Sequence, residues 1–275
     1  MASGVPAGKR VIAHRGASAY APEHTAAAYR LAIDQHTDLI EPDLAVTRDQ
    51  VLICLHDDSL ERTTNVADVF PDRAKGLAND FTISEIKRLD AGTRFGPEFA
   101  GQRIQTFQEA IDLVRGKAGL HPELKSPRLY ASRGIDQVRL VRDLIRRNGL
   151  DTAASLETTP IIIESFEETA VRRLAEELPT IPHVLLVERG GDVSEGRLRE
   201  IKRFATGVAP EKSLVAEYPE MVDQAHALGL TVTCWTFRAD ESTRFGSVGQ
   251  EMSAYLYDYG IDALFTNNPD LFPRS

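Results

Sequence analysis

The chain has 275 residues, of which 42% are hydrophobic, and its formal net charge is −9. This length and apolar content are enough to bury a full core, and they allow either two small domains or one large barrel. The negative charge disfavours a nucleic-acid partner, because phosphate backbones need a clustered positive surface. There is no apolar stretch of about 18 residues, and the start, MASGVPAGKR, lacks the apolar segment of a signal peptide, so we expect no stable membrane insertion.

Short apolar runs alternate with longer segments of helical periodicity along the whole chain, which is typical of repeated β-α units and a parallel sheet. Strands are predicted at residues 10–13, 39–46, 119–124, 160–164, 183–187, 207–208, 231–234 and 263–265. Helices are predicted near residues 25–34, 106–115, 136–148, 167–177, 195–204, 219–227 and 249–259. This series of units predicts a single α/β domain over residues 1–275, a (β/α)8 TIM barrel.

A doubly wound open sheet is the alternative architecture for the same alternation. Its nucleotide-binding turn requires a glycine fingerprint after the first strand. In this chain that turn reads His14-Arg15-Gly16-Ala17-Ser18, which contains neither this fingerprint nor a P-loop. The barrel is therefore the favoured fold.

One segment breaks the alternation. Residues 57–105 are rich in Asp, Arg, Thr, Pro and Gly and contain one short helical patch around residues 84–89. A segment of this length is too long for an ordinary β-α loop. It is predicted to form a small insertion over the barrel mouth, after the second strand.

Charged residues gather at the predicted strand ends, and in a barrel of this kind the active site lies at the C-terminal ends of the strands. Two residues that are two positions apart in a strand point to the same face. The strand ends concerned carry His14 and Arg15, then Glu41 and Asp43, then His56 and Asp57 after the run 51–55, and then Glu123 and Lys125.

Glu41, Asp43 and Glu123 are the candidate metal ligands. Three carboxylates that converge inside a barrel mouth repel one another and lose hydration unless a cation lies among them. A hard divalent ion, Ca2+ or Mg2+, suits ligands that are all oxygen. The alternative is that each carboxylate forms a separate salt bridge at its own strand end.

His14 and His56 are the candidate catalytic residues, because imidazole titrates near neutral pH and can both accept and donate a proton. Arg15 and Lys125 supply fixed positive charge that suits a phosphate oxygen. His121 shares the strand face of Glu123 and is a further candidate to line the barrel interior.

A series of short motifs resembles the glycerophosphodiester phosphodiesterase family in order and spacing. No single motif is specific, but the set covers nearly the whole chain. The motifs are His14-Arg15-Gly16-Ala17, Pro22-Glu23-His24-Thr25, Glu41-Pro42-Asp43, His56-Asp57, Glu123-Leu124-Lys125, Ser165-Phe166, Trp235-Thr236 and Gly260-Ile261-Asp262-Ala263-Leu264-Phe265-Thr266.

This resemblance implies a barrel with an insertion after the second strand and a single divalent metal ion. It implies metal binding by Glu41, Asp43 and Glu123, acid and base roles for His14 and His56, phosphate binding by Arg15, and a place in the substrate pocket for Trp235. Residues 63–73 resemble the branch that includes exported bacterial enzymes, which often use calcium; this is the one feature that favours a periplasmic or secreted location.

The implied activity is hydrolysis of a small-molecule glycerophosphodiester to glycerol 3-phosphate and an alcohol. Hydrolysis of a lysophospholipid, a lysophospholipase D activity, is the alternative within the same chemistry. A catalytically inactive barrel that only binds phosphodiesters would be expected to lack one of the two histidines or one of the three metal carboxylates, and all five are present. A glycosidase with paired carboxylates would leave His14, Arg15 and His56 without roles.

Two positions depart from the family pattern. The usual Pro-Glu-Asn-Thr reads Pro22-Glu23-His24-Thr25, which places a larger, titratable ring beside the predicted site. The usual Thr-Asp before the final proline reads Thr266-Asn267, a change expected to act behind the site or in a helix cap.

Overall fold

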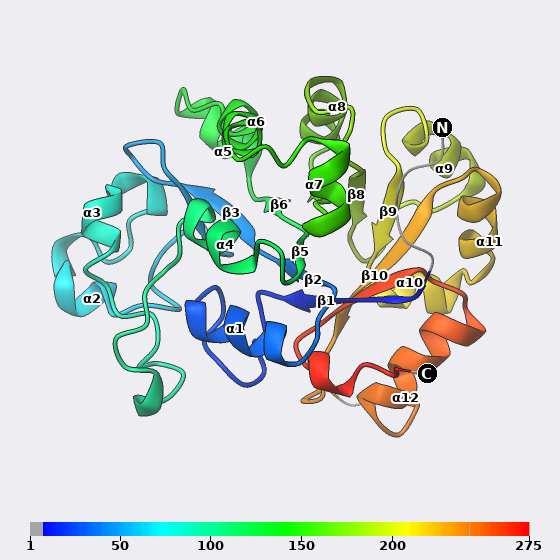
Figure 1. The fold of residues 1–275 in the computed structure, drawn as a ribbon, viewed down its shortest axis with the longest axis horizontal. Coiled ribbons are helices and arrows are strands. Elements are labelled where there is room, and N and C mark those ends of the chain that lie inside the picture. Colours follow the sequence, from blue (N-terminus) through cyan, green and yellow to red (C-terminus); the bar gives the residue numbers. More distant parts are fainter. Residues whose placement is uncertain (1–7, 242, 275) are drawn as a thin grey trace.

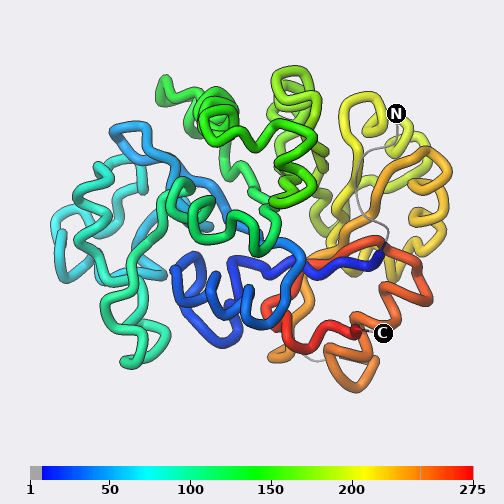
Figure 2. The backbone as a smooth tube through the Cα atoms, viewed as in Figure 1, coloured from blue at the N-terminus to red at the C-terminus, as the bar shows by residue number. Residues whose placement is uncertain are grey.

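The computed structural model describes residues 8–241 and 243–274, and within them eight parallel strand positions form a closed barrel (Figure 1). The first strand, β1 (Arg10–His14), pairs with the last, β11 (Ala263–Thr266), and also with β2 (Leu39–Glu41). Figure 2 shows the blue start of the trace beside its red end. Pairing between the first and last strands closes the sheet, and the predicted TIM barrel is confirmed.

Prolines interrupt the second and third barrel strands. Predicted strand 39–46 is split at Pro42 into β2 and β3 (Asp43–Val46), and predicted strand 119–124 is split before β6 (Glu123–Leu124) by Pro122. Proline has no N–H to donate to a neighbouring strand, so the ladder breaks there. β2 pairs with β5 (Gly119–Leu120) and β3 pairs with β6, so each split strand still occupies one position in the barrel.

The remaining barrel strands lie close to the predicted positions. β10 runs further than predicted, because the apolar run continues through Trp235 to Phe237. One additional strand, β4 (Leu52–Cys54), pairs antiparallel with β3 and forms a hairpin with it. The other barrel strands are β7 (Ile163–Ser165), β8 (His183–Val187), β9 (Gly207–Pro210) and β10 (Thr231–Phe237).

Each predicted helix has a counterpart around the barrel. The Thr25 side chain caps α1, and Thr106 with Glu109 forms the capping box that the sequence predicts at the start of α4. The helices are α1 (Ala26–Asp34), α4 (Phe107–Val114), α6 (Gln137–Arg147), α8 (Glu168–Glu177), α9 (Glu195–Ile201), α11 (Glu220–Ala227) and α12 (Val248–Ser253), which continues in a π-helical turn (Ala254–Asp258).

Three further helices lie between predicted elements: α5 (Pro127–Ser132), α7 (Ala153–Thr158) and α10 (Lys212–Glu217). Each has six residues, which is too short to show a helical period in the sequence.

Residues 57–105 form short helical turns at the left edge of the barrel in Figure 1. Leu60, Val66, Phe81 and Ile86 are buried in the same hydrophobic cluster as strand residue Leu44. The segment is therefore packed onto the barrel, and its role as an insertion over the mouth stays a prediction. Its elements are α2 (Val66–Val69), α3 (Ile83–Ile86) and single turns at Pro71–Arg73, Ala78–Asp80 and Pro97–Phe99. Across the described residues, no helix has the length and apolar character needed to cross a bilayer.

Candidate active site

The predicted site residues come together at the C-terminal ends of the barrel strands. A cavity of about 330 Å³ opens there. It is lined by His14, Arg15, Glu41, His56, Glu123, Lys125, Glu164, Phe166, Leu186, Trp235, Thr236, Arg238 and Phe265.

Three buried carboxylates share this cavity. Glu41, Glu123 and Glu164 each place one carboxylate oxygen within 4.8 Å of the others. Burial raises the pKa of the Glu41 and Glu123 carboxyls well above the usual value, and the charge of Asp43 raises both further. Burial also raises the pKa of Glu164. Oε1 of Glu41 and Oε2 of Glu164 have no hydrogen-bond partner. An all-oxygen donor set with free buried lone pairs suits a hard divalent cation.

This group differs from the predicted trio, which contained Asp43 in place of Glu164. Oδ2 of Asp43 accepts from Nε2 of His24 at 2.9 Å and lies 3.1 Å from Nε of Arg15. Burial alone would raise the pKa of the Asp43 carboxyl, but the His24 hydrogen bond and the Arg15 charge hold that pKa well below its usual range. Oδ2 of Asp43 therefore already accepts from His24 and faces the Arg15 guanidinium, whereas Oε2 of Glu164 has no hydrogen-bond partner.

Glu164 was missed in the sequence, although a signal was present. It follows the apolar run 161–163 as the middle residue of β7, and it stands directly beside Glu123 in the parallel register. A carboxylate at the end of a fourth neighbouring strand could have been added to the cluster on the same argument as the other three. Nδ1 of His121, the predicted interior histidine, lies 3.5 Å from Oε2 of Glu164.

Arg15 lies at the centre of the charged network. It adopts a left-handed φ of +61°, and its backbone N–H donates to Oε2 of Glu41 at 2.9 Å. Its guanidinium contacts Asp43 and also Oε1 of Glu23 at 3.3 Å. Burial opposes its charge, but Asp43 and Glu23 together raise the pKa of Arg15. A side chain held this way presents a permanent positive charge to the cavity.

The two predicted catalytic histidines have different partners. Nδ1 of His14, at the end of β1, lies 2.7 Å from Oδ1 of Asn267, so the departure at Asn267 acts behind the site as expected. Burial, followed by the charge of Arg15, lowers the pKa of His14 to about 3. Nδ1 of His56 lies 2.7 Å from a carboxylate oxygen of Asp57. Burial also lowers the pKa of His56, while Asp43 and Asp57 oppose the shift.

Lys125 and Trp235 complete the cavity wall. Nζ of Lys125 lies 3.0 Å from Oε1 of Glu123 and 5.7 Å from the centre of the Phe166 ring. Trp235 meets Phe166 edge to face, and its indole N–H donates to the carbonyl of Ala209. Phe166 is 39% exposed, so the cavity combines a hydrophobic wall with a charged floor.

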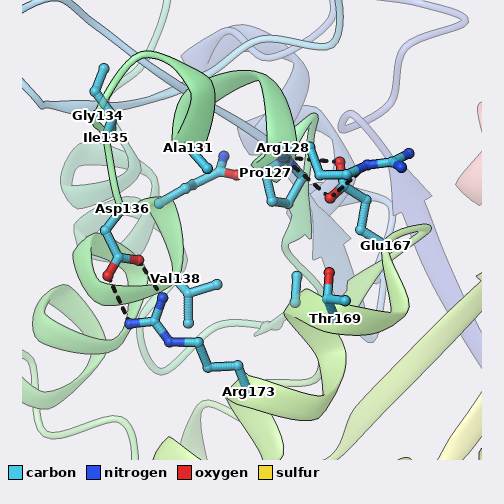
Figure 3. A pocket seen from close by; sticks show the side chains of 12 residues that line it. Pro127, Arg128, Ala131, Gly134, Ile135, Asp136, Val138, Glu167, Thr169 and Arg173 are labelled. Carbon is cyan, nitrogen blue, oxygen red and sulfur yellow. Dashed lines mark hydrogen bonds and ion pairs between the residues drawn. The ribbon is translucent and has the colours of Figure 1, made fainter.

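A separate hollow of about 430 Å³ lies outside the barrel, between α5, α6 and α8 (Figure 3). Its charged groups are already paired: Arg173 with Asp136 at 2.7 Å, and Nε of Arg128 with Glu167 at 3.4 Å. None of the predicted catalytic or metal residues lines it. The strand-end cavity is therefore the candidate active site.

Comparison with known proteins identifies the family. Residues 14–271 match the model of the glycerophosphoryl diester phosphodiesterase family. A glycerophosphodiester phosphodiesterase of Bacillus subtilis is 33% identical over 96% of this chain and 85% of its own. The putative glycerophosphodiester phosphodiesterase YhdW of the same organism is 32% identical over 94% and 95%.

A solved phosphodiesterase from Oleispira antarctica, in complex with the product sn-glycerol-3-phosphate, superposes with a TM-score of 0.76 at 27% identity, covering 95% of this chain and 94% of its own. The matched segment contains every strand end that lines the cavity. The chain therefore belongs to the glycerophosphoryl diester phosphodiesterase family and is a phosphoric diester hydrolase.

Proposed function

We propose that this enzyme hydrolyses glycerophosphodiesters to glycerol 3-phosphate and an alcohol, using one divalent metal ion and two histidines. One observation carries the proposal: buried carboxylates, the cations Arg15 and Lys125 and two histidines line a single cavity of about 330 Å³. The Oleispira relative with bound sn-glycerol-3-phosphate supports the choice of product.

The proposed ligands of the metal ion are Glu41, Asp43 and Glu123, with Glu164 as a fourth carboxylate. The unpartnered oxygens of Glu41 and Glu164 and the raised pKa values of Glu41, Glu123 and Glu164 support a bound cation, because the cluster is short of positive charge without one. Ca2+ and Mg2+ both suit these oxygens. When bound, such an ion supplies positive charge to the phosphoryl oxygens.

Arg15 and Lys125 are proposed to bind the phosphate oxygens that face the cavity. His14, whose low pKa keeps its ring neutral, takes the proton of the attacking oxygen. That oxygen belongs either to water or to the neighbouring hydroxyl of the glycerol. His56, held by the carboxylate of Asp57, donates a proton to the departing alcohol.

The adjoining surface favours a polar alcohol over an acyl chain. A hollow of about 490 Å³ shares Glu123, Lys125 and Phe166 with the active-site cavity and leads away from it. Its outer wall includes Glu188 and Asp192, both exposed. A fatty chain there would displace water from charged groups, which is unfavourable. We therefore place glycerophosphodiesters before lysophospholipids as substrates.

The test uses two substrates that differ in leaving group. His14→Ala and His56→Ala are both expected to nearly abolish hydrolysis of glycerophosphocholine. With a p-nitrophenyl diester of glycerol phosphate, the leaving group needs no proton, so His56→Ala should recover much of a general-acid contribution of about 100-fold to 10,000-fold. Equal losses of both folded variants on both substrates would contradict the division of roles.

A parallel measurement tests the substrate and the metal. Glycerophosphocholine, glycerophosphoethanolamine and lysophospholipids are offered to the wild-type enzyme before and after chelation. Chelation should abolish hydrolysis, and Ca2+ or Mg2+ should restore it. Full activity in protein whose metal content is nil would contradict the carboxylate assignment, and faster turnover of lysophospholipids would reverse the substrate order.

A further inference from the structure

Arg62, at the start of the 57–105 segment, contacts two carboxylates that come from different parts of the chain. Its Nε and Nη2 lie 2.6 Å and 3.0 Å from the two carboxylate oxygens of Asp57. Its Nη1 and Nη2 lie 2.8 Å and 2.7 Å from those of Glu23. One guanidinium thus forms a two-pronged contact with each carboxylate, the geometry in which arginine binds most strongly and with the most defined orientation.

Each of these carboxylates in turn holds a side chain of the active site. Oδ1 of Asp57 contacts Nδ1 of His56 at 2.7 Å, and Oε1 of Glu23 contacts Nη1 of Arg15 at 3.3 Å. Arg62 therefore lies between the proposed proton donor and the proposed phosphate-binding arginine. Charges alternate from Asp43 through Arg15, Glu23 and Arg62 to Asp57, which in turn contacts the His56 ring.

The exposure of this group argues against a role in stability alone. The side chain of Arg62 is 47% exposed, against 18% for Glu23 and 27% for Asp57. Exposed ion pairs contribute little to stability, typically about 0–1 kcal/mol. These ion pairs instead fix the orientation of active-site side chains, because Glu23 and Asp57, the two partners of Arg62, each contact a residue that lines the cavity.

We propose that Arg62 is a positioning residue of the hydrolase, which holds His56 through Asp57 and Arg15 through Glu23. The inference rests on the proposed roles of His56 and Arg15. With Asp57 held still, its carboxylate accepts the Nδ1 proton of His56, so Nε2 is the nitrogen left to face substrate. With Glu23 held still, the Arg15 guanidinium keeps its direction. The 57–105 segment thereby takes part in assembling the active site.

A second arginine provides a matched control. Nη1 of Arg133, the residue directly after α5, donates to Oδ1 of Asp80 at 2.8 Å and to Asn79 at 2.9 Å, so it also ties the 57–105 segment to the barrel by a guanidinium. It is 37% exposed, and neither Asp80 nor Asn79 contacts His56 or Arg15. Loss of Arg133 therefore tests whether the 57–105 segment must be held to the barrel in general, while the contacts of Arg62 with Glu23 and Asp57 stay intact.

The experiment compares Arg62→Gln, Arg62→Lys and Arg133→Gln in metal-saturated full-length enzyme with glycerophosphocholine. Loss of a group that orients a catalytic side chain from behind typically costs about 10–100-fold in activity. We expect Arg62→Gln to lower kcat by this factor with KM changed by less than about 3-fold. Arg62→Lys should recover part of the loss, since an ammonium keeps the charge but not the double contact. Arg133→Gln should stay within about 2-fold of wild type.

Combination with Asp57→Asn adds a readout that a purely structural role would not give. If Arg62 acts on His56 through Asp57, the double variant loses less kcat than the product of the two single losses, because both changes break the contact to His56, and only the part of the Arg62 effect that runs through Glu23 and Arg15 is added. The same kcat for Arg62→Gln and Arg133→Gln would overturn the proposal, as would losses that multiply in the double variant.

Should Arg62→Gln fail to fold by circular dichroism, Arg62→Lys carries the test: wild-type kcat in that variant together with full additivity to Asp57→Asn overturns the proposal. Failure of the proposed function is recognised separately, because wild-type enzyme would then not hydrolyse the diester or His56→Ala would retain full turnover.

Discussion

The carboxylate cluster predicts that a single substitution stabilises the metal-free protein while weakening its response to metal. Glu164→Gln keeps the size of the side chain and one oxygen but removes a charge. At an effective dielectric constant of about 20, two unit charges 4.8 Å apart repel by about 3.5 kcal/mol. Buried carboxyls relieve part of this repulsion by taking up protons, so we expect metal-free Glu164→Gln to be more stable than wild type by about 1–3 kcal/mol at pH 8.

The pH dependence has a definite sign. A carboxyl whose pKa is raised in the folded state holds its proton longer when folded than when unfolded. Its folded pKa lies above the ordinary 4.5, so the free energy of unfolding of metal-free wild type falls as pH rises beyond about 4.5 and the cluster loses protons. The advantage of Glu164→Gln should therefore grow between pH 5 and pH 8.

The assay is urea unfolding with chelator, followed by thermal unfolding during titration with Ca2+ or Mg2+. Metal at 100 times its Kd stabilises a folded protein by about 2.7 kcal/mol, and the variant should need more metal for the same shift. Glu200→Gln, which removes a surface carboxylate paired with Arg197, is the control and should change neither quantity. A metal-free Glu164→Gln less stable than wild type, with an unchanged metal response, would refute the reasoning.

Two further predictions concern groups outside the cluster. Lys125→Met should lower kcat by about 100-fold on both glycerophosphocholine and its p-nitrophenyl counterpart, because the lost charge faces the phosphate and not the leaving group; a loss on one substrate only would contradict this placement. Burial lowers the pKa of His183 from 6.5 to about 4, so stability is lost as pH falls from 6.5 to 4. By urea unfolding, wild type should lose about 3 kcal/mol more than His183→Phe over that interval; equal slopes would argue against a neutral buried ring.

The sequence predicted the barrel well because its signals are local. Each apolar run and each amphipathic segment reports its own element, and Thr106 with Glu109 marks a helix start within four residues. The splits at Pro42 and Pro122 were also visible as prolines within predicted strands, but the parallel pairing that bridges them depends on neighbours far along the chain. Helices of one or two turns carry too few residues to show a period.

The site was predicted only as far as strand-end residues and short motifs extend. The residues His14, Arg15, Glu41, Glu123 and Lys125 follow from their position at strand ends, and the structure brings them into one cavity. The contacts that connect such residues to their supporting side chains could not be predicted in this way. Those of Arg62 with Glu23 span 39 positions in the chain, and no pattern in either segment marks them. Which side chains meet across the fold depends on how distant elements pack together, and this packing leaves no local pattern in the sequence.

His24, the ring that stands where the family pattern has asparagine, gives the last prediction. It is buried, with Nε2 on Asp43 at 2.9 Å and Nδ1 3.0 Å from the hydroxyl of Tyr29. Burial raises the pKa of Tyr29 well above its usual value, so the phenol keeps its proton and is a hydrogen-bond donor to Nδ1 in the tautomer that carries the ring proton on Nε2. The Nε2 proton of His24 is then directed at Asp43, and the chain Tyr29–His24–Asp43 fixes one carboxylate among the proposed metal ligands.

Removal of the His24 ring, which holds Asp43, should weaken metal binding by about 10–100-fold, as loss of a group that hydrogen-bonds a metal ligand commonly does. We expect this for His24→Ala in calorimetric titration of chelator-treated protein with Ca2+ or Mg2+. Tyr29→Phe, which removes only the hydroxyl, should show a smaller loss. His24→Asn tolerates the left-handed φ of +58° and keeps an amide donor, so it should lie closest to wild type. Unchanged affinity in folded His24→Ala would show that Asp43 is not a ligand and serves only to hold Arg15.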